Sequence, residues 1–129
     1  DVRLQAHATG MWKAAPDHLP TVLQAPPPHA DFRKPRQLEP GHTIDHSFEG
    51  WDGAADIVWP SRRLSVRVSA TTSRYVLYTP VQYDFFCFEP VDHTINAHNL
   101  PGQPQDHGLT ILGTGQSLQR SYQFTVTSI

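Results

Sequence analysis

The sequence predicts an all-β fold, an antiparallel β-sandwich, on three observations. Apolar and polar residues alternate along several short stretches, which is typical of strands with one buried face. Turn-forming residues separate these stretches, and the 12 prolines among 129 residues are about 9% of the chain, against a usual ~5%. No stretch shows the sustained 3.6-residue apolar period of an amphipathic helix. The length suits one domain with one core.

The first third of the chain predicts three strands and a long loop. Residues 2–7 alternate apolar and polar side chains, so they predict a half-buried strand. Residues 11–14 follow a Thr-Gly turn and residues 21–24 follow a proline-bounded turn, so each predicts another short strand. Residues 25–29 hold three consecutive prolines, which lack backbone donors, and predict a loop or an edge. The polar stretch 31–41 predicts a solvated loop.

The rest of the chain continues the same pattern. Residues 43–48 predict a strand that ends at a Gly-Trp-Asp-Gly turn, and residues 55–59 predict another that closes at a proline. Residues 63–69 alternate Leu and Val with Arg and Ser, which is the clearest pattern in the chain of a strand with one solvent-exposed face. Residues 73–80 and 118–126 predict two further strands.

An aromatic stretch, residues 85–89, predicts a strand that ends in a carboxylate, Glu89. Side chains alternate along a strand, so Glu89 shares a face with the apolar side chains two and four residues before it. Burial beside them would raise the pKa of Glu89 toward the range of a general base. Pro90 is expected to stop the strand at the carboxylate. The alternative is a glutamate at a strand end that simply reaches solvent.

Five stretches together resemble one known family, the aldose 1-epimerase (galactose mutarotase-like) family. Residues 85–93 resemble its apolar strand ending in Glu-Pro, and residues 96–99 resemble the polar loop with an Asn that follows. Residues 108–117 match its Gly-x-x-x-Leu-x-x-Gly-x-Ser/Thr segment. Residues 44–48, Ile-Asp-His-Ser-Phe, resemble its Asp-x-x-Phe segment. Residues 3–12 resemble the strand that follows its His-x-Tyr-Phe motif.

The resemblance implies a function and a set of site residues. It implies part of a galactose mutarotase-like supersandwich and a mutarotase that interconverts the α and β anomers of an aldohexose by general acid–base catalysis. Glu89 would be the catalytic base, and Asp45 would accept hydrogen bonds from adjacent sugar hydroxyls. His93 and Asn96, in the loop after Glu89, would border the sugar site. From the residues alone, Asp45 could instead form a turn.

The resemblance covers nearly all of this chain but only the later part of the family's domain. We therefore expect residues 1–129 to be one unit, the carboxyl-terminal fragment of a longer domain, and the strand-like pattern directly at Asp1 agrees with this expectation. The family's catalytic acid lies in the His-x-Tyr-Phe motif, and none of the eight histidines has that context. The chain alone is therefore expected to be nearly inactive.

Composition and charge predict which partners the protein lacks. The formal net charge is −2 without a basic cluster, so no nucleic-acid partner is expected. No apolar run approaches the roughly 20 residues of a membrane helix, so no membrane partner is expected. The single cysteine, Cys87, has no partner for a disulfide, which favours a cytoplasmic location. The expected partner is a small-molecule sugar.

The eight histidines raise the alternative of a metal site, which we do not expect. His42 and His46 have a spacing that suits a helix, whereas their stretch is predicted as strand and turn. No cysteine or carboxylate set completes a ligand group around them or around His93 and His98. No metal or other cofactor is therefore expected.

Two further functions stay open from the sequence. One is a non-catalytic carbohydrate-binding β-sandwich that recognises a phosphorylated sugar through Arg33, Lys34 or Arg36. The other is an interaction module without a sugar site. In either case, part of a larger sandwich would leave apolar sheet surface or an open edge exposed, so self-association of the chain is expected.

Overall fold

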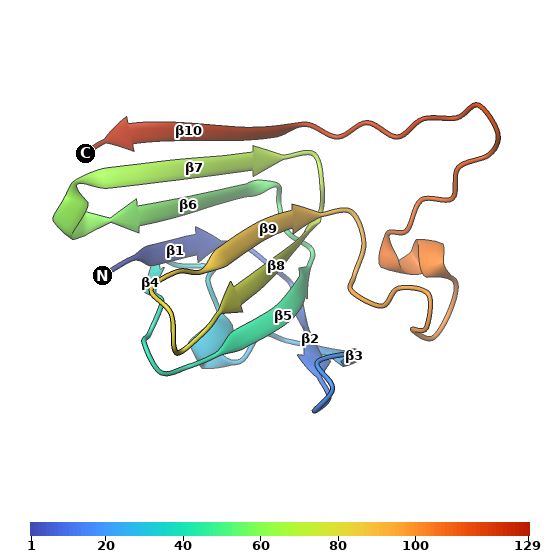
Figure 1. The fold of residues 1–129 in the computed structure, drawn as a ribbon, viewed down its shortest axis with the longest axis horizontal. Helices are drawn as coiled ribbons and strands as arrows, with labels where there is room; N and C mark the ends of the chain where they lie inside the picture. The colour runs from blue at the N-terminus through green and yellow to red at the C-terminus, as the bar shows by residue number, and fades with distance from the viewer.

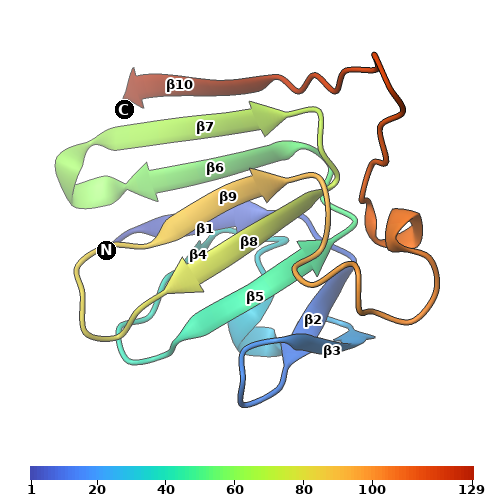
Figure 2. The same ribbon diagram turned by 45° about the vertical axis from the view of Figure 1, so that its right-hand side comes forward.

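The computed structural model describes residues 1–129 and confirms the all-β prediction. Two antiparallel five-stranded sheets pack face to face (Figures 1 and 2). Sheet A has the strand order β10-β7-β6-β1-β4, and sheet B has the order β3-β2-β5-β8-β9. The strands of sheet A are β1 (Arg3–Ala6), β4 (Arg36–Gln37), β6 (Ala54–Trp59), β7 (Leu64–Ala70) and β10 (Tyr122–Ser128). Those of sheet B are β2 (Gly10–Ala14), β3 (Pro20–Gln24), β5 (Ile44–Glu49), β8 (Arg74–Thr79) and β9 (Cys87–Val91).

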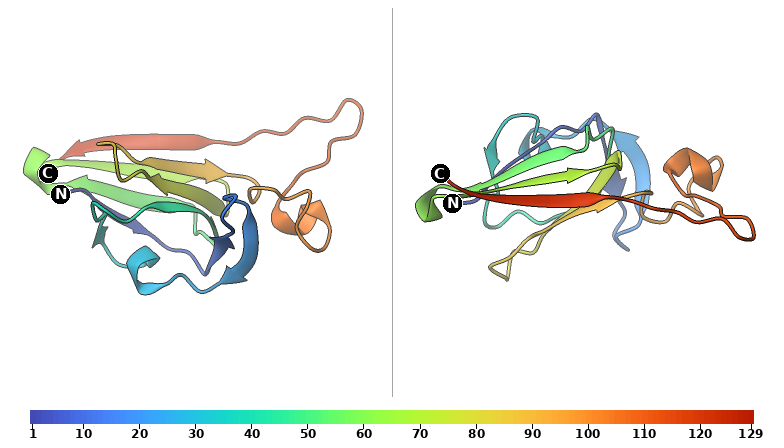
Figure 3. Two further views of the ribbon diagram at one scale, coloured as in Figure 1. Left: turned by 60° about the horizontal axis from the view of Figure 1, so that its bottom comes forward. Right: turned by 90° about the horizontal axis from the view of Figure 1, so that it is seen from above.

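The only helices are three short 3₁₀ turns, η1 (Pro28–Ala30), η2 (Pro60–Arg62) and η3 (Pro104–His107). Each has a proline in its first turn, where the missing backbone donor costs no hydrogen bond. None of them approaches the length and apolar character that a membrane span requires. The long connection from β9 to β10 contains η3 and extends past the ends of the sheets (Figure 3).

The core lies between the two sheets and is rich in aromatic rings. Phe48 and Tyr75 are fully buried and stack with ring centroids 4.6 Å apart, and Phe88 stacks on the other side of Tyr75 at 4.7 Å. Phe48 and Tyr75 are paired across β5 and β8, and Phe88 lies on β9 beside them. Alternate residues of these three strands therefore point inward, as the period-two pattern predicts.

The structure corrects three expectations about element boundaries. β9 does not stop at Glu89 but continues through Pro90 to Val91. This is tolerated because β9 is an edge strand, where a proline can lack its donor without breaking a ladder on both sides. The stretch 31–41 is not only a solvated loop, because Phe32 is 2% exposed in the core and β4 lies within the stretch. The last strand begins at Tyr122 rather than at residue 118.

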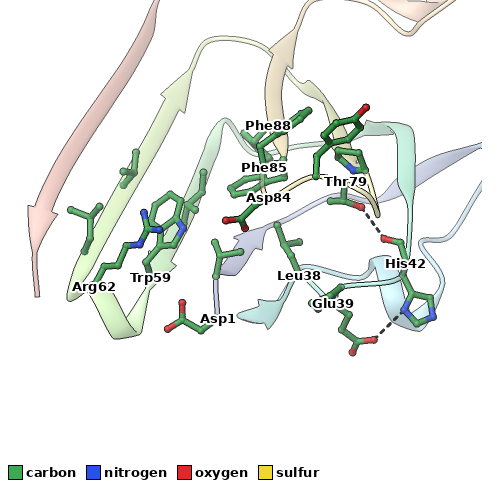
Figure 4. A pocket seen from close by; sticks show the side chains of 18 of the residues that line it. Asp1, Leu38, Glu39, His42, Trp59, Arg62, Thr79, Asp84, Phe85 and Phe88 are labelled. Atoms are coloured by element: carbon green, nitrogen blue, oxygen red, sulfur yellow. Dashed lines mark hydrogen bonds and ion pairs between the residues drawn. The ribbon is translucent and has the colours of Figure 1, made fainter.

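The inner face of sheet A is only partly covered. Sheet B ends at β9, and no strand beyond it lies over β10. Phe124 and Val126, which alternate on the inner face of β10, are therefore 62% and 65% exposed. A cavity of about 740 Å³ opens there between the sheets, and Figure 4 shows Trp59 and Phe88 among the side chains that line it.

Candidate functional site

The outer face of sheet B, which points away from sheet A, carries both carboxylates that the sequence singles out. Asp45 on β5 pairs directly with Tyr78 on β8, and Tyr78 pairs with Cys87 on β9. In the next row, Ser47 on β5 pairs with Val76 on β8, and Val76 pairs with Glu89 on β9. Side chains directly opposite one another share a face, as do residues two apart in one strand.

Asp45 and Glu89 are therefore on one surface, two strands apart and one row apart. Strand spacing and rise place their Cα atoms about 12 Å from each other, close enough for one sugar ring to lie between the two side chains. The strand register creates this proximity, because 44 positions of sequence separate the two residues. The roles of Asp45 and Glu89 remain predictions, and the structure places the two side chains on the same face.

The surroundings of Glu89 confirm one expectation and correct another. Phe86 and Phe88 point into the core, where they pack against Trp59 and Tyr75, so the predicted alternation of faces is confirmed. The expected desolvation of Glu89 is wrong for this chain, because the side chain is exposed to solvent. The physical reason is the edge position of β9 together with the exposure of the neighbouring Phe85, which is 52% exposed and does not shield the carboxylate.

Asp45 is only partly exposed, with 35% of its side chain accessible. Its Oδ2 lies 3.4 Å from Nδ1 of His18, a residue at the tip of the turn between β2 and β3. No other protein group pairs with the carboxylate of Asp45. The contact with His18 thus restrains Oδ2 of Asp45, and Oδ1 is free to accept a hydrogen bond from a ligand.

The loop after β9 borders the same face, but its two predicted sugar-binding residues differ in what they already do. His93 is exposed, and its Nδ1 lies 3.0 Å from the carbonyl oxygen of Thr94. Asn96 has a left-handed backbone conformation with φ 62°, and its side-chain oxygen accepts a hydrogen bond of 2.6 Å from Nδ2 of Asn99. Asn96 therefore stabilises a turn, which is a structural function that the sequence reasoning did not assign to it.

Glu49 anchors this loop to sheet B and was missed by the sequence reasoning. Its carboxylate accepts hydrogen bonds from Nε1 of Trp12, at 2.9 Å, and from Oγ1 of Thr94, and it forms an ion pair of 2.7 Å with Arg74. Thr94 is fully buried and Trp12 is 7% exposed. The backbone N–H of Ile95 also donates to Oγ of Ser47. No local pattern could reveal this cluster, because its members come from three strands and a loop.

The basic stretch 33–36 does not provide a ready phosphate site at Arg33. Phe32, beside Arg33, packs with its ring centroid 6.4 Å from that of Phe48 on the opposite, inner side of β5. Arg33 is bound to both carboxylate oxygens of Asp31, and this pairing lowers the pKa of Asp31 to about 2. The guanidinium of Arg33 is thus already neutralised, which does not favour a phosphate site there. Burial also lowers the pKa of His46, which faces the inner side.

The histidines and the cavity do not form a second site on the outer face. No group of three or more His, Cys, Asp or Glu side chains is arranged to hold a metal ion. His42 pairs with Glu39 at 3.5 Å on the rim of the cavity between the sheets (Figure 4). That cavity includes neither Asp45 nor Glu89 and is lined mainly by apolar residues. We therefore place the candidate site on the open outer face and not in the cavity.

Comparisons with known proteins bear on the family and the fold. Residues 1–125 match the model of the family described as "Aldose 1-epimerase". An uncharacterized protein of Escherichia coli K12, YphB, is 28% identical over 125 residues, which cover 89% of this chain and 42% of that protein. A crystal structure of an Escherichia coli K12 protein described as a "putative aldose 1-epimerase" matches with a TM-score of 0.87 and 26% identity. The match covers 99% of this chain and 46% of that one, so the chain spans less than half the length of these relatives.

Proposed function

Because this chain belongs to the aldose 1-epimerase family, we propose that it supplies the catalytic base and a sugar-binding carboxylate of a mutarotase. The base is Glu89, and the carboxylate that grips the sugar hydroxyls is Asp45. The observation that carries the proposal is the register of sheet B, which puts these two family-matched carboxylates on one open face. The substrate class is an aldohexose with a free anomeric hydroxyl.

The proposed reaction opens and recloses the sugar ring. Glu89 removes the proton of the anomeric hydroxyl while an acid protonates the ring oxygen, so the C1–O5 bond breaks as the C1 carbonyl forms. Rotation about C1–C2 presents the other face of the aldehyde to O5. The same two groups then return their protons in the opposite sense, and the ring closes as the other anomer. Asp45 holds the remaining hydroxyls so that C1 stays beside Glu89.

This chemistry places few demands on the surroundings. Proton transfers between a sugar and two side chains consume no cofactor, so we propose that the site works without one. His93 and Asn96 are proposed to border the sugar through the loop that Glu49 anchors, with Asn96 acting by shaping the turn. We also propose a cytoplasmic location, where the unpaired Cys87 stays reduced.

The acid is proposed to come from a part of the domain that this chain does not match. The uncovered inner face of β10 supports that proposal, because a sandwich gains stability by burying such a face under further strands. A longer domain that covers β9 would also desolvate Glu89, which is exposed in this chain. We refer below to the chain together with that proposed part as the full-length protein.

We expect the full-length protein to accelerate mutarotation and the 129-residue chain to be nearly inactive. The chain holds a base but no partner acid, and general acid and general base catalysis each contribute about 10²–10⁴-fold. Polarimetry of freshly dissolved α-glucose or α-galactose measures both proteins against the uncatalysed rate. A rate for the chain that equals the rate for the full-length protein would contradict the proposal that the base lies in this chain and the acid outside it.

The isolated chain is expected to self-associate. Phe124 and Val126 expose apolar surface beside a free strand edge that carries no charge and no proline, and such edges pair with other strands. Sedimentation velocity at two concentrations should show a larger species at the higher one. Replacing Phe124 and Val126 with threonine should restore the monomer, whereas replacing Gln123 and Thr125 with serine on the other face of β10 should not. A wild-type chain that is monomeric at both concentrations would contradict this proposal.

A further inference from the structure

His18 lies at the tip of the turn between β2 and β3, held in a conformation that most residues avoid. Its φ is 64°, in the left-handed region, where residues other than glycine are uncommon. Two backbone hydrogen bonds, from His18 to Ala15 and from Ala15 to Leu19, close the turn. Asp17 adds a third bond by accepting from the N–H of Leu19. These three hydrogen bonds hold the backbone of the turn in place, and the backbone sets the point from which the His18 side chain projects.

The side chain of His18 points toward Asp45. Nδ1 of His18 lies 3.4 Å from Oδ2 of Asp45, although 27 positions separate the two residues in sequence. A carboxylate only accepts hydrogen bonds, so we assign the proton of this contact to Nδ1 of His18. In the neutral ring the other nitrogen, Nε2, then has a free lone pair. The side chain of His18 is 75% exposed, so a ligand can reach that nitrogen.

We propose that His18 and Asp45 together form a two-acceptor site for two adjacent hydroxyls of the sugar. The proposal rests on the proposed function and deepens it. Oδ1 of Asp45 accepts from one hydroxyl, and Nε2 of His18 accepts from its neighbour. The contact through Oδ2 also limits rotation of the Asp45 carboxylate, so His18 positions Asp45 as well as binding the sugar. The substrate class is thus an aldose with a vicinal diol on the side of the ring away from C1.

The test is the kinetics of the full-length protein with His18→Asn. Asparagine tolerates the left-handed conformation, so the turn is kept, and its Nδ2 can donate to Asp45 from the place of Nδ1, but it has no counterpart of Nε2 to accept from the sugar. The variant loses one hydrogen bond to the sugar, so KM should rise about two- to tenfold. kcat should stay within about twofold, because His18 does not reach the reacting atoms in the proposed geometry.

A series of monodeoxy sugars makes the test specific for hydroxyl binding. The sugar that lacks the hydroxyl bound by His18 should show a raised KM with the wild-type protein and no further rise with His18→Asn. The other deoxy sugars should show the full effect of the substitution. A substitution that raises KM equally for every sugar in the series would overturn the hydroxyl contact.

Two controls separate failure of this proposal from failure of the proposed function. His42→Asn makes the same change in a matched exposed pair, with Glu39 at 3.5 Å, and should leave KM unchanged. Asp45→Asn should raise KM more than His18→Asn does. If Asp45→Asn raises KM and His18→Asn does not, only the role of His18 is wrong. If neither raises KM, the sugar site itself is misplaced. A fall in kcat together with a lower melting temperature for His18→Asn would mean a structural role and would overturn the proposal.

Discussion

Replacing Glu89 with glutamine is expected to lower kcat of the full-length protein by about 10²–10⁴-fold, the usual contribution of a general base. Glutamine keeps the size and hydrogen-bonding shape of the side chain but cannot take a proton from the anomeric hydroxyl. KM should change little, because Asp45 and not Glu89 is proposed to hold the sugar. Polarimetry of α-glucose or α-galactose over a range of concentrations measures both constants.

Cys87 provides an independent measure of binding for this variant. It is the single cysteine of the chain, it lies two residues before Glu89, and it shares a row with Asp45 on the outer face of sheet B. A sugar held between Asp45 and Glu89 would cover it, so sugar should slow alkylation of Cys87 in both the wild-type protein and Glu89→Gln. Where the full-length protein has further cysteines outside this chain, mass spectrometry identifies which cysteine is alkylated.

The control for Glu89→Gln is Glu39→Gln, which changes another exposed glutamate that lies on the rim of the cavity between the sheets. This variant should keep the wild-type kcat. Full activity of Glu89→Gln would show that the base lies elsewhere. Sugar protection of Cys87 without any mutarotation by the wild-type full-length protein would instead favour the non-catalytic carbohydrate-binding β-sandwich.

Replacing Glu49 with alanine is expected to cost about 3–5 kcal/mol of the free energy of unfolding. The side chains of Glu49 and Arg74 are only 15% and 16% exposed, so removal of the carboxylate leaves a mostly buried guanidinium without its counter-charge. Trp12 and Thr94 lose their common acceptor at the same time. Urea denaturation of the 129-residue chain, followed by circular dichroism, measures the change.

Asp56→Ala is the matched control, because it breaks an Asp–Arg pair of similar length whose side chains are 43% and 55% exposed. Such exposed pairs are worth ~0–1 kcal/mol, so the control should be far milder. The double variant with Arg74→Leu should recover part of the loss, since it also removes the unpaired charge. Equal effects of Glu49→Ala and Asp56→Ala would contradict the proposal that Glu49 anchors the loop.

The two largest predictions concern neighbouring parts of one surface. Glu89 belongs to the open part, where a ligand can approach, and Glu49 belongs to the part covered by the loop after β9. Two glutamates on the same face of one sheet thus have opposite surroundings. Glu89 is exposed and can be reached by a ligand, whereas Glu49 is buried with Arg74, Trp12 and Thr94 and has a structural role.

The sequence by itself determined the fold class, and it predicted the two carboxylates of the proposed site. The alternation in β7 and the aromatic stretch before Glu89 predict strands and buried faces, because the period of two is a local property of an extended chain. The family segments around Asp45 and Glu89 are also local. They identify the residues of the proposed site, but they do not say which side chains surround them.

Only the tertiary structure decided the surroundings. The shared face of Asp45 and Glu89 depends on the register of β5, β8 and β9, and a shift of one residue would turn one carboxylate to the core. The contact of His18 with Asp45, the anchor at Glu49 and the passage of β9 through Pro90 likewise depend on distant segments or on an edge position. Local periodicity cannot encode these features, because pairing and packing between distant strands fix them.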